Sequence, residues 1–274
     1  LLTHTSGLTY GFNEGLLPKI YTEHGVSFDP AAGGLDASVK RLSEVPLAFQ
    51  PGTKWEYSVG IDVIGRVIEV VSDQSLDEYL QEYIFDPLDM KDTGFMLPED
   101  KIDRFADCYA WTEKQTLFRV DSASSSEFGV GKVDTFSGGG GLVSTLHDYY
   151  HFGEVIRKGG VSVNGHRLLS PRILAFMRGN HLPGDIASMG PTSFAEMPMR
   201  GMGFGIGGAS VLDPARVGIP SSLGDYGWGG MASTYFWTDP VEQLTCIFFT
   251  QLIPSSTYPN RAEFKALVHA ALIN

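Results

Sequence analysis

Tyr57 is a candidate for proton transfer because of its position in the chain. It ends the loop PGTKWEY at residues 51–57 and stands just before a helical pattern. A tyrosine at such a junction can hold its hydroxyl toward a cleft and exchange a proton with a reacting group there. The structural alternative is a hydroxyl that simply hydrogen-bonds the backbone, as buried tyrosines commonly do.

A second candidate segment covers residues 224–240, where several glycines surround Trp228. Glycines such as Gly229 and Gly230 let the backbone approach another backbone or a ligand without Cβ collisions. From residue 231 to 238 the side chains alternate in character, so we expect a glycine-rich turn followed by one strand with two distinct faces. A substrate could lie along the edge of that strand. The alternative is a tight turn packed by a tryptophan.

His147 and His151 lie four residues apart on one side of a predicted helix, with Asp148 following the first of them. This spacing is close to the zinc-peptidase pattern His-Glu-x-x-His, in which the glutamate acts as the base. Aspartate is shorter than glutamate, and the sequence offers no obvious third ligand. We therefore interpret these residues as helix-surface histidines, and we expect neither a metal nor an organic cofactor.

Two glycine motifs argue against other enzyme classes. Ser58 and Gly60 form half of a Gly-x-Ser-x-Gly elbow, but Glu56 stands where its first glycine is needed. No complete copy of that motif occurs, which argues against an α/β-hydrolase. The glycines at 138–141 are not followed by Gly-Lys-Ser/Thr, so we expect them to form a turn or a close backbone approach rather than a phosphate loop.

The composition restricts the partners of this protein. The chain has 274 residues, is 43% hydrophobic, and carries 20 basic against 32 acidic side chains, which gives a net charge of −12. A charge of that sign repels nucleic-acid backbones and anionic membranes. No apolar run is long enough to span a membrane, and no signal segment opens the chain. We expect no nucleic-acid or membrane partner and favour a cytoplasmic location, and because Leu1 opens the chain we expect its true N-terminus not to be represented.

Periodicity predicts a mostly helical domain over residues 1–200. Helical spacing or capping patterns predict helices that begin near residues 35, 58, 75, 145 and 171. In the helix near 145 we expect Leu146, Tyr149, Tyr150 and Ile156 to face inward. Residues 108–120 mix aromatic and threonine side chains in a way that indicates short strands.

The remaining residues, 201–274, predict an antiparallel sheet with a C-terminal helix. The expected strands cover residues 204–212, 231–238 and 244–252, and the helix begins near Asn260. Its apolar residues should cover the sheet; these are Phe264, Leu267, Val268 and Ala271. The two parts together give an α+β fold in which helices flank an antiparallel sheet beside a mostly helical domain.

Five segments, in order along the whole chain, resemble one family. They are LLTHTSGL at 1–8, PGTKWEYSVGIDVIGRVIE at 51–69, FDPLDMKDTGF at 85–95, GGGGLVSTLHDY at 138–149 and WGGMASTYFWTDP at 228–240. They resemble the family VIII carboxylesterases, which are similar to class C β-lactamases and D-amino-acid peptidases of penicillin-binding-protein architecture. The resemblance implies a β-lactamase/transpeptidase-like fold and acyl transfer through a serine ester.

The resemblance also implies roles for individual residues. Tyr57 corresponds to the family tyrosine that exchanges a proton with the nucleophile and the leaving group. Trp228, Gly229 and Gly230 correspond to the Lys-Thr-Gly strand of β-lactamases, so the N–H of Met231 would be an oxyanion-hole donor. The β-lactamase lysine helps to bind the substrate carboxylate, whereas an indole offers an apolar wall without charge. We therefore expect short-chain, uncharged carboxylic esters as the small-molecule substrates.

The family nucleophile and base lie in a Ser-x-x-Lys motif, and this sequence has none. The residue three before each of its nine lysines is never serine. In the family this motif precedes the segment that resembles residues 1–8, so we expect the N-terminal strands and nucleophile helix to be absent here. An earlier segment or a separate chain would then carry Ser-x-x-Lys. The alternatives are a β-lactamase or D-aminopeptidase of the same fold, or a catalytically inactive binding module.

Overall fold

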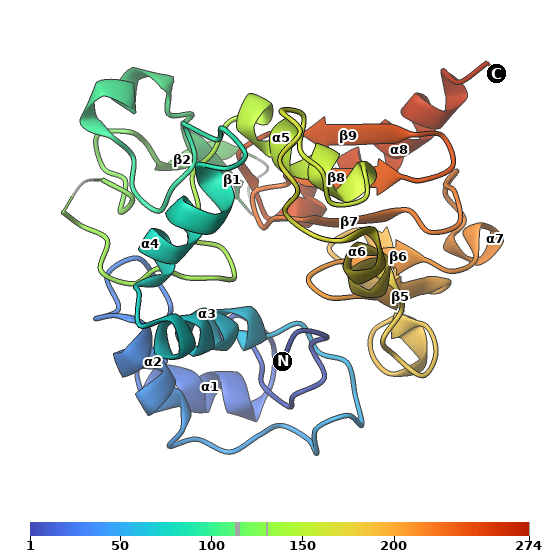
Figure 1. The fold of residues 1–274 in the computed structure, drawn as a ribbon. Helices are drawn as coiled ribbons and strands as arrows, with labels where there is room; N and C mark the ends of the chain where they lie inside the picture. Colours follow the sequence, from blue (N-terminus) through green and yellow to red (C-terminus); the bar gives the residue numbers. More distant parts are fainter. Residues whose placement is uncertain (113–115, 130, 274) are drawn as a thin grey trace. The chain divides into compact units, whose positions relative to one another are not determined.

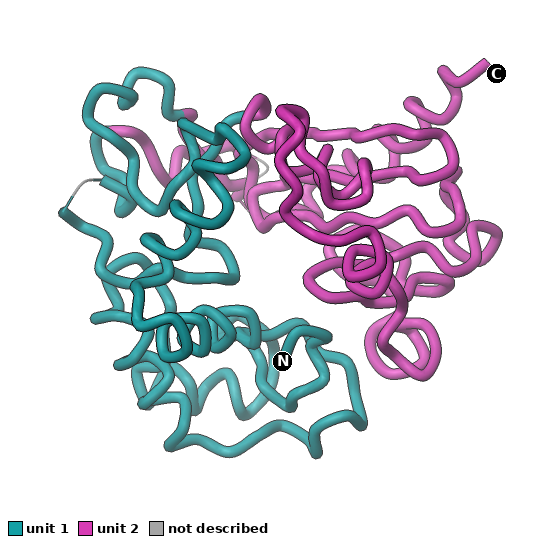
Figure 2. The backbone as a smooth tube through the Cα atoms, viewed as in Figure 1, with its two compact units in different colours: residues 1–105, 124–145 teal, residues 106–123, 146–274 magenta. Residues whose placement is uncertain are grey.

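The computed structural model describes residues 1–112, 116–129 and 131–273. The chain forms two compact units, coloured differently in Figure 2. Unit 1 comprises Leu1–Phe105 and Ser124–Thr145, and unit 2 comprises Ala106–Ala123 and Leu146–Asn274. The units differ in extent from the domains expected over 1–200 and 201–274, because helices within residues 146–178 pack with the sheet of unit 2.

Unit 1 is largely helical (Figure 1). Its helices are α1 (Leu16–Glu23), α2 (Leu35–Leu42), α3 (Gly60–Ser72) and α4 (Leu76–Leu80), followed by the π-helical turn Gln81–Phe85 and the 3-10 helix Glu99–Arg104. The predicted helices near 35, 58 and 75 are confirmed. At the last of them the expected capping box between Ser75 and Glu78 is present, and the N–H of Ser75 donates to Oε2 of Glu78 at 3.2 Å.

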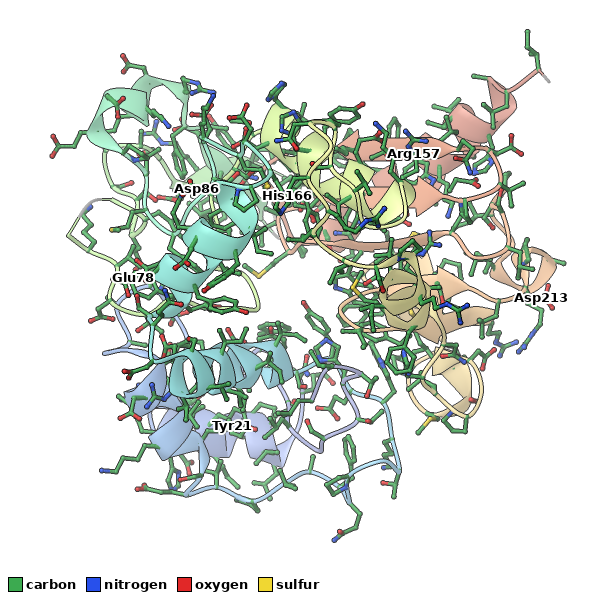
Figure 3. All side chains as sticks on the ribbon, in the orientation of Figure 1. Tyr21, Glu78, Asp86, Arg157, His166 and Asp213 are labelled. Atoms are coloured by element: carbon green, nitrogen blue, oxygen red, sulfur yellow. The ribbon has the colours of Figure 1, made fainter. Side chains whose placement is uncertain are left out.

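The core of unit 1 brings α1 and α2 together with the segments beside Tyr57. Tyr21, labelled in Figure 3, is only 1% exposed on α1 and belongs to this cluster. The cluster comprises Leu8, Leu17, Tyr21, Leu42 and Val59. Because Val59 lies two residues after Tyr57, the same packing that folds the unit fixes the start of α3.

Unit 2 is built on a five-stranded antiparallel sheet (Figure 1). The strand order is β5 (Met202–Phe204), β6 (Ala209–Val211), β7 (Tyr226–Gly229), β8 (Tyr235–Asp239) and β9 (Leu244–Phe248). A second sheet has the order β10 (Leu252–Ile253), β1 (Cys108–Trp111) and β2 (Leu117–Asp121), and β3 (Ser193–Phe194) pairs with β4 (Met197–Pro198). The short strands expected over 108–120 are therefore present, although residues 113–115 lie outside the described residues.

Helices cover both faces of the five-stranded sheet. Phe236 packs against Tyr149 of α5 (Leu146–Arg157), whereas Trp237 packs against Phe264 of α8 (Asn260–Ala270). Neighbouring residues of a strand point to opposite faces, so α5 and α8 lie on opposite sides of β8. The unit also contains α6 (Pro171–Arg178), α7 (Pro214–Val217) and the 3-10 turns Ile186–Ser188 and Ser255–Thr257.

Three strand predictions were wrong in extent. Residues 204–212 form the β5–β6 hairpin, because the chain reverses at glycines between the strands, with Gly207 at a φ of 80°. The segment 231–238 is a turn followed by β8, and Trp228 and Gly229 lie in strand β7 rather than in a turn. The segment 244–252 divides between β9 and β10, which belong to different sheets.

Two helix faces also differ from the prediction. On α5, Leu146 and Tyr150 are 52% and 42% exposed instead of facing inward. On α8, Leu267 is 70% exposed, while Arg261 and Lys265 are each only 3% exposed and face the sheet. The inward face of α8 is thus charged, because buried carboxylates lie opposite it.

In the described residues, no helix has the length and apolar character needed to cross a membrane.

Candidate active site

Tyr57 lies in unit 1, three residues before α3 begins, and is half-buried. The side-chain amide of Asn13 donates to the Tyr57 carbonyl at 3.3 Å, which ties the segment before α3 to the N-terminal loop. The rings of His4 and Tyr10 lie with their centroids 4.6 and 5.1 Å from that of Tyr57. Tyr57 therefore contacts two ring side chains from the first ten residues.

Tyr10 lies beside Tyr57 and was not singled out from the sequence. Burial raises the pKa of its hydroxyl, and the neighbouring Tyr57 and Asp62 and a hydrogen bond to Tyr57 raise that pKa further. Tyr10 thus keeps its proton at neutral pH and can donate it in the hydrogen bond that it shares with Tyr57. A donor in that position stabilises negative charge on Tyr57 and suits a tyrosine that accepts a proton.

Asp62 and Gly139 lie close to the Tyr10 side chain. Asp62 is 1% exposed, and its Oδ1 accepts hydrogen bonds from the Ser137 hydroxyl at 2.5 Å and the Gly139 N–H at 3.1 Å. Burial raises the pKa of Asp62, and those two hydrogen bonds oppose the shift. A Cβ at Gly139 would lie 2.6 Å from Asp62 Oδ2 and 2.7 Å from the Tyr10 hydroxyl oxygen. The close approach expected among the glycines at 138–141 is confirmed at Gly138, Gly139 and Gly141, whereas a Cβ at Gly140 would meet nothing within 4 Å.

His4 accepts a hydrogen bond from Ser58, the residue that follows Tyr57. Its Nδ1 accepts from the backbone N–H of Ser58 at 3.2 Å, and the side chain is 2% exposed. Burial lowers the pKa of His4 to about 3, so the folded protein keeps the imidazole neutral. Because Nδ1 accepts, the ring proton is on Nε2.

This burial makes stability fall in acid. Between pH 6.5 and 3 the unfolded chain binds a proton at His4 that the folded chain does not, so stability decreases as the pH falls through that window. The expected loss is about 2 kcal/mol at pH 5. His4→Asn keeps an acceptor for Ser58 without titrating. Urea unfolding at pH 7, 6 and 5 should show a weaker acid loss for this variant, and an unchanged pH dependence would exclude His4 as the cause.

Trp228 lies in unit 2 and is packed by two aromatic rings. Phe194 of β3 is stacked on it at 5.9 Å and 16°, and Phe204 of β5 meets it edge-on at 5.2 Å. β7 pairs with β6 only at Tyr226 and Gly227, whereas β8 continues alongside as far as Gly229. Trp228 and Gly229 therefore extend past the paired part of β6 and carry an apolar, aromatic surface.

The turn after β7 carries Met231. The Gly230 N–H donates to the Thr234 carbonyl at 2.9 Å, and Ser233, at a φ of 67°, donates back to the Gly230 carbonyl at 3.2 Å. Met231 is 63% exposed at the tip. In the part of the chain that the structure describes, its backbone N–H donates to no protein acceptor. The turn thus presents a backbone donor that is available to a ligand, as an oxyanion-hole group must be.

The histidine pair on α5 remains without a third metal ligand in the described residues. The side chain of His147 is 76% exposed, whereas His151 is 8% exposed and therefore not a surface residue.

A different group, Asp225, Asp239 and His269, places ligand atoms within 4.8 Å of one another. The ammonium of Lys265 lies 2.8 Å from Asp225 and supplies the positive charge there.

The predicted site residues thus fall into two groups. Trp228, Gly229, Gly230 and Met231 are brought together by β7 and its turn in unit 2, and Tyr57 belongs to unit 1. Sequence patterns missed Tyr10 and Asp62, because an aromatic in a loop and an acidic residue in the first turn of a helix are common in structural roles.

Comparison with known proteins identifies the family. A family model described as Beta-lactamase matches residues 1–270. Protein Rv1367c of Mycobacterium tuberculosis is 34% identical over 259 residues, covering 93% of this chain and 62% of that protein. Esterase EstB of Burkholderia gladioli is 31% identical over 267 residues, covering 91% and 63%. The chain therefore spans somewhat less than two thirds of the length of these relatives.

A solved structure gives the same result for the fold. The structure of EstCE1, a hydrolase with promiscuous acyltransferase activity, matches with a TM-score of 0.81 and 24% identity, covering 98% of this chain and 70% of that one. The β-lactamase/transpeptidase-like fold predicted from the sequence is confirmed. With a family model that matches nearly the whole chain and a solved neighbour of the same fold, this chain belongs to the beta-lactamase family.

Proposed function

We propose that this protein is a serine hydrolase that cleaves short-chain carboxylic esters through an acyl-enzyme. We further propose that a separate N-terminal segment supplies the Ser-x-x-Lys motif, because no serine stands three before any lysine of this sequence. The relative named as an esterase, EstB, supports ester chemistry for this branch of the family. The reaction needs neither a metal nor an organic cofactor.

The observation that carries the proposal is the aromatic surroundings of Trp228. Phe194 and Phe204 pack the indole into an apolar wall at the position where β-lactamases carry a lysine. The nearby cation, Arg261, is 3% exposed and donates to backbone carbonyls, so it does not replace that lysine as a partner for a substrate carboxylate. An apolar wall favours neutral acyl and alcohol groups over charged ones.

The chemistry follows the acyl-enzyme route. The serine oxygen attacks the ester carbonyl carbon, and its proton passes through Tyr57 to the alcohol oxygen as the carbon–oxygen bond breaks. The Met231 N–H donates to the negative oxygen that forms during each attack. Water then attacks the acyl-enzyme and releases the carboxylic acid and the free serine. Tyr10 supports Tyr57 by donating to its oxygen while Tyr57 holds negative charge.

A denatured intact mass, taken before and after treatment with a fluorophosphonate, tests the proposal. The reagent modifies an activated serine, and the present sequence accounts for 29.8 kDa. We expect a larger polypeptide, or a second one, to gain one phosphonyl group. A single 29.8 kDa species that takes up no label and hydrolyses no ester would contradict the proposal and favour a binding module.

The same preparation separates the alternative chemistries. A β-lactamase or D-aminopeptidase would hydrolyse ampicillin or a D-alanyl amide faster than p-nitrophenyl butyrate. A zinc enzyme that used His147 and His151 would lose its activity on treatment with a chelator. We expect p-nitrophenyl butyrate to be the better substrate and the chelator to have no effect.

Trp228→Ala is expected to change substrate preference more than stability. Removing the indole takes away the apolar wall beside Gly229, so relative kcat/KM values across acyl lengths should shift by about 10–100-fold, the range expected for pocket contacts. The measurement compares p-nitrophenyl acetate, butyrate and octanoate. Relative rates identical to those of the wild type would show that the indole serves only to pack Phe194 and Phe204.

A further inference from the structure

Arg261 is a buried cation whose acceptors are mainly backbone carbonyls. It lies in the first turn of α8, and its side chain is 4% exposed. Its Nη2 donates to the carbonyls of Gly230 at 2.5 Å and Thr234 at 3.1 Å, and Nη1 donates to that of Ala195 at 3.2 Å. Burying a guanidinium is costly unless its donors are used, so this arrangement fixes all three carbonyls relative to one another.

Two of these carbonyls belong to the turn that carries Met231. Gly230 and Thr234 are the residues that close this turn, and Arg261 binds both from the α8 side. A second set of bonds holds the turn through β10, where Ser233 Oγ donates to the Leu252 carbonyl at 2.7 Å and the Leu252 N–H donates to Ala232 at 3.1 Å. The turn that bears Met231 is therefore held by hydrogen bonds to both Arg261 and Leu252.

The guanidinium also accounts for the glycine at position 229. A Cβ placed there would lie 2.5 Å from Cζ of Arg261, so the cation packs directly against the backbone of β7. A larger residue at 229 would displace Arg261 from the turn carbonyls. Gly229 and Arg261 are thus complementary parts of one packing arrangement.

The third carbonyl links the turn to the β3–β4 hairpin. Ala195 and Glu196 form the tip of this hairpin, with φ values of 46° and 67° that non-glycine residues adopt rarely. The backbone N–H of Arg261 donates to Oε1 of Glu196 at 3.1 Å, and the guanidinium of Arg261 donates to the Ala195 carbonyl. The residue before them, Phe194, stacks on Trp228. Arg261 therefore also fixes the hairpin that completes the aromatic wall.

We propose that Arg261 is a positioning residue that sets both the Met231 donor and the Phe194–Trp228 wall at the substrate site. This inference rests on the proposed esterase function. Arg261 touches no reacting atom; it acts through the carbonyls that it binds. Only a planar fork of donors reaches several carbonyls in fixed directions, so lysine should substitute poorly.

The test uses the full-length protein with its nucleophile segment and compares Arg261→Lys and Arg261→Met with Lys265→Met. Lys265 is a matched control, since it lies one turn further along α8 and is equally buried but pairs with Asp225 rather than with the turn. We expect both Arg261 variants to lose about 10–100-fold in kcat on p-nitrophenyl butyrate and to change their preference among acyl lengths. Lys265→Met should lose stability while its folded fraction keeps the wild-type kcat.

Hydrogen exchange adds a measurement that does not depend on turnover. The amides of Gly230 and Ser233, whose hydrogen bonds close the turn, should exchange about ten-fold faster in Arg261→Lys than in the wild type and stay protected in Lys265→Met. A folded Arg261→Lys variant with wild-type kcat and wild-type exchange would overturn the inference, as would an equal loss of kcat in Lys265→Met. A wild type that neither turns over nor labels would overturn the proposed function, and the exchange comparison would still decide whether Arg261 fixes the turn.

Discussion

Tyr57→Phe is expected to lower kcat by about 10²–10⁴-fold in the full-length protein, since a positioned acid–base group contributes rate of that order. The substitution removes one oxygen and keeps the ring that packs against His4 and Tyr10. The lost hydrogen bond from Tyr10 should cost only about 0.5–1.5 kcal/mol of stability. The measurements are kcat on p-nitrophenyl butyrate, the rate of fluorophosphonate labelling, and urea unfolding.

Tyr21→Phe provides a matched control in the same unit. It also removes a phenol hydroxyl that is hydrogen-bonded, to the Thr9 N–H at 3.4 Å, but from the core rather than beside Tyr57. We expect a similar loss of stability with unchanged kcat. A Tyr57→Phe variant with near-normal turnover, or an equal loss of kcat in both variants, would argue against proton transfer by Tyr57.

The sequence predicted those features of the fold that local patterns determine. Ser75 and Glu78 marked the start of α4 because a capping box is a short-range signal. The Ser170-Pro171 pair marked α6 in the same way, and the Ser170 hydroxyl accepts from the Ile173 N–H at 3.2 Å. A loop–helix junction and a glycine-rich segment singled out Tyr57 and Trp228, and the family resemblance supplied the roles expected of them.

The errors lie where distant residues decide the local structure. Alternation alone placed Met231 in a strand, but the hydrogen bond between Gly230 and Thr234 closes a turn there, and contacts with Arg261 and Leu252 support it. These partners are far from the turn in sequence, so no pattern within residues 224–240 reveals them. Tyr10 was missed for the same reason, because its significance comes from contacts with Tyr57 and Asp62.

The C-terminal helix shows the limit of apolar periodicity most clearly. Phe264 packs on Trp237 as expected, yet Leu267 is 70% exposed while Arg261 and Lys265 are buried. A buried lysine needs a carboxylate as its partner. The partner of Lys265 is Asp225, which lies forty residues earlier in the sequence. A helix whose inward face is charged therefore cannot be recognised without knowledge of the strand opposite.

This buried pair gives the second large effect, a loss of about 3–5 kcal/mol of stability in Lys265→Met. Lys265 Nζ lies 2.8 Å from Asp225 Oδ2, and the two side chains are 3% and 2% exposed. Methionine keeps most of the apolar chain but leaves the Asp225 carboxylate buried without its cation. Lys158→Met is the control: its ammonium lies 3.2 Å from Glu154 but is 39% exposed, so we expect less than about 1 kcal/mol. Urea unfolding of the full-length variants measures both.

The dependence of this loss on pH identifies its cause. Burial raises the pKa of Asp225 above its usual range, and the charge of Lys265 opposes that shift, so removing Lys265 raises the pKa further. A carboxyl whose pKa is higher in the folded state destabilises the fold at high pH, and this destabilisation decreases as the pH falls from the folded pKa to the unfolded value of about 3.9. The difference between wild type and Lys265→Met should therefore shrink as the pH falls from 8 toward about 4. A second substitution, Asp225→Asn, should restore stability at pH 8, because it removes the charge and keeps an acceptor for the Ser222 N–H. A difference that stays constant with pH and survives Asp225→Asn would assign the loss to packing against Trp237, whose ring lies 5.4 Å from the Lys265 ammonium.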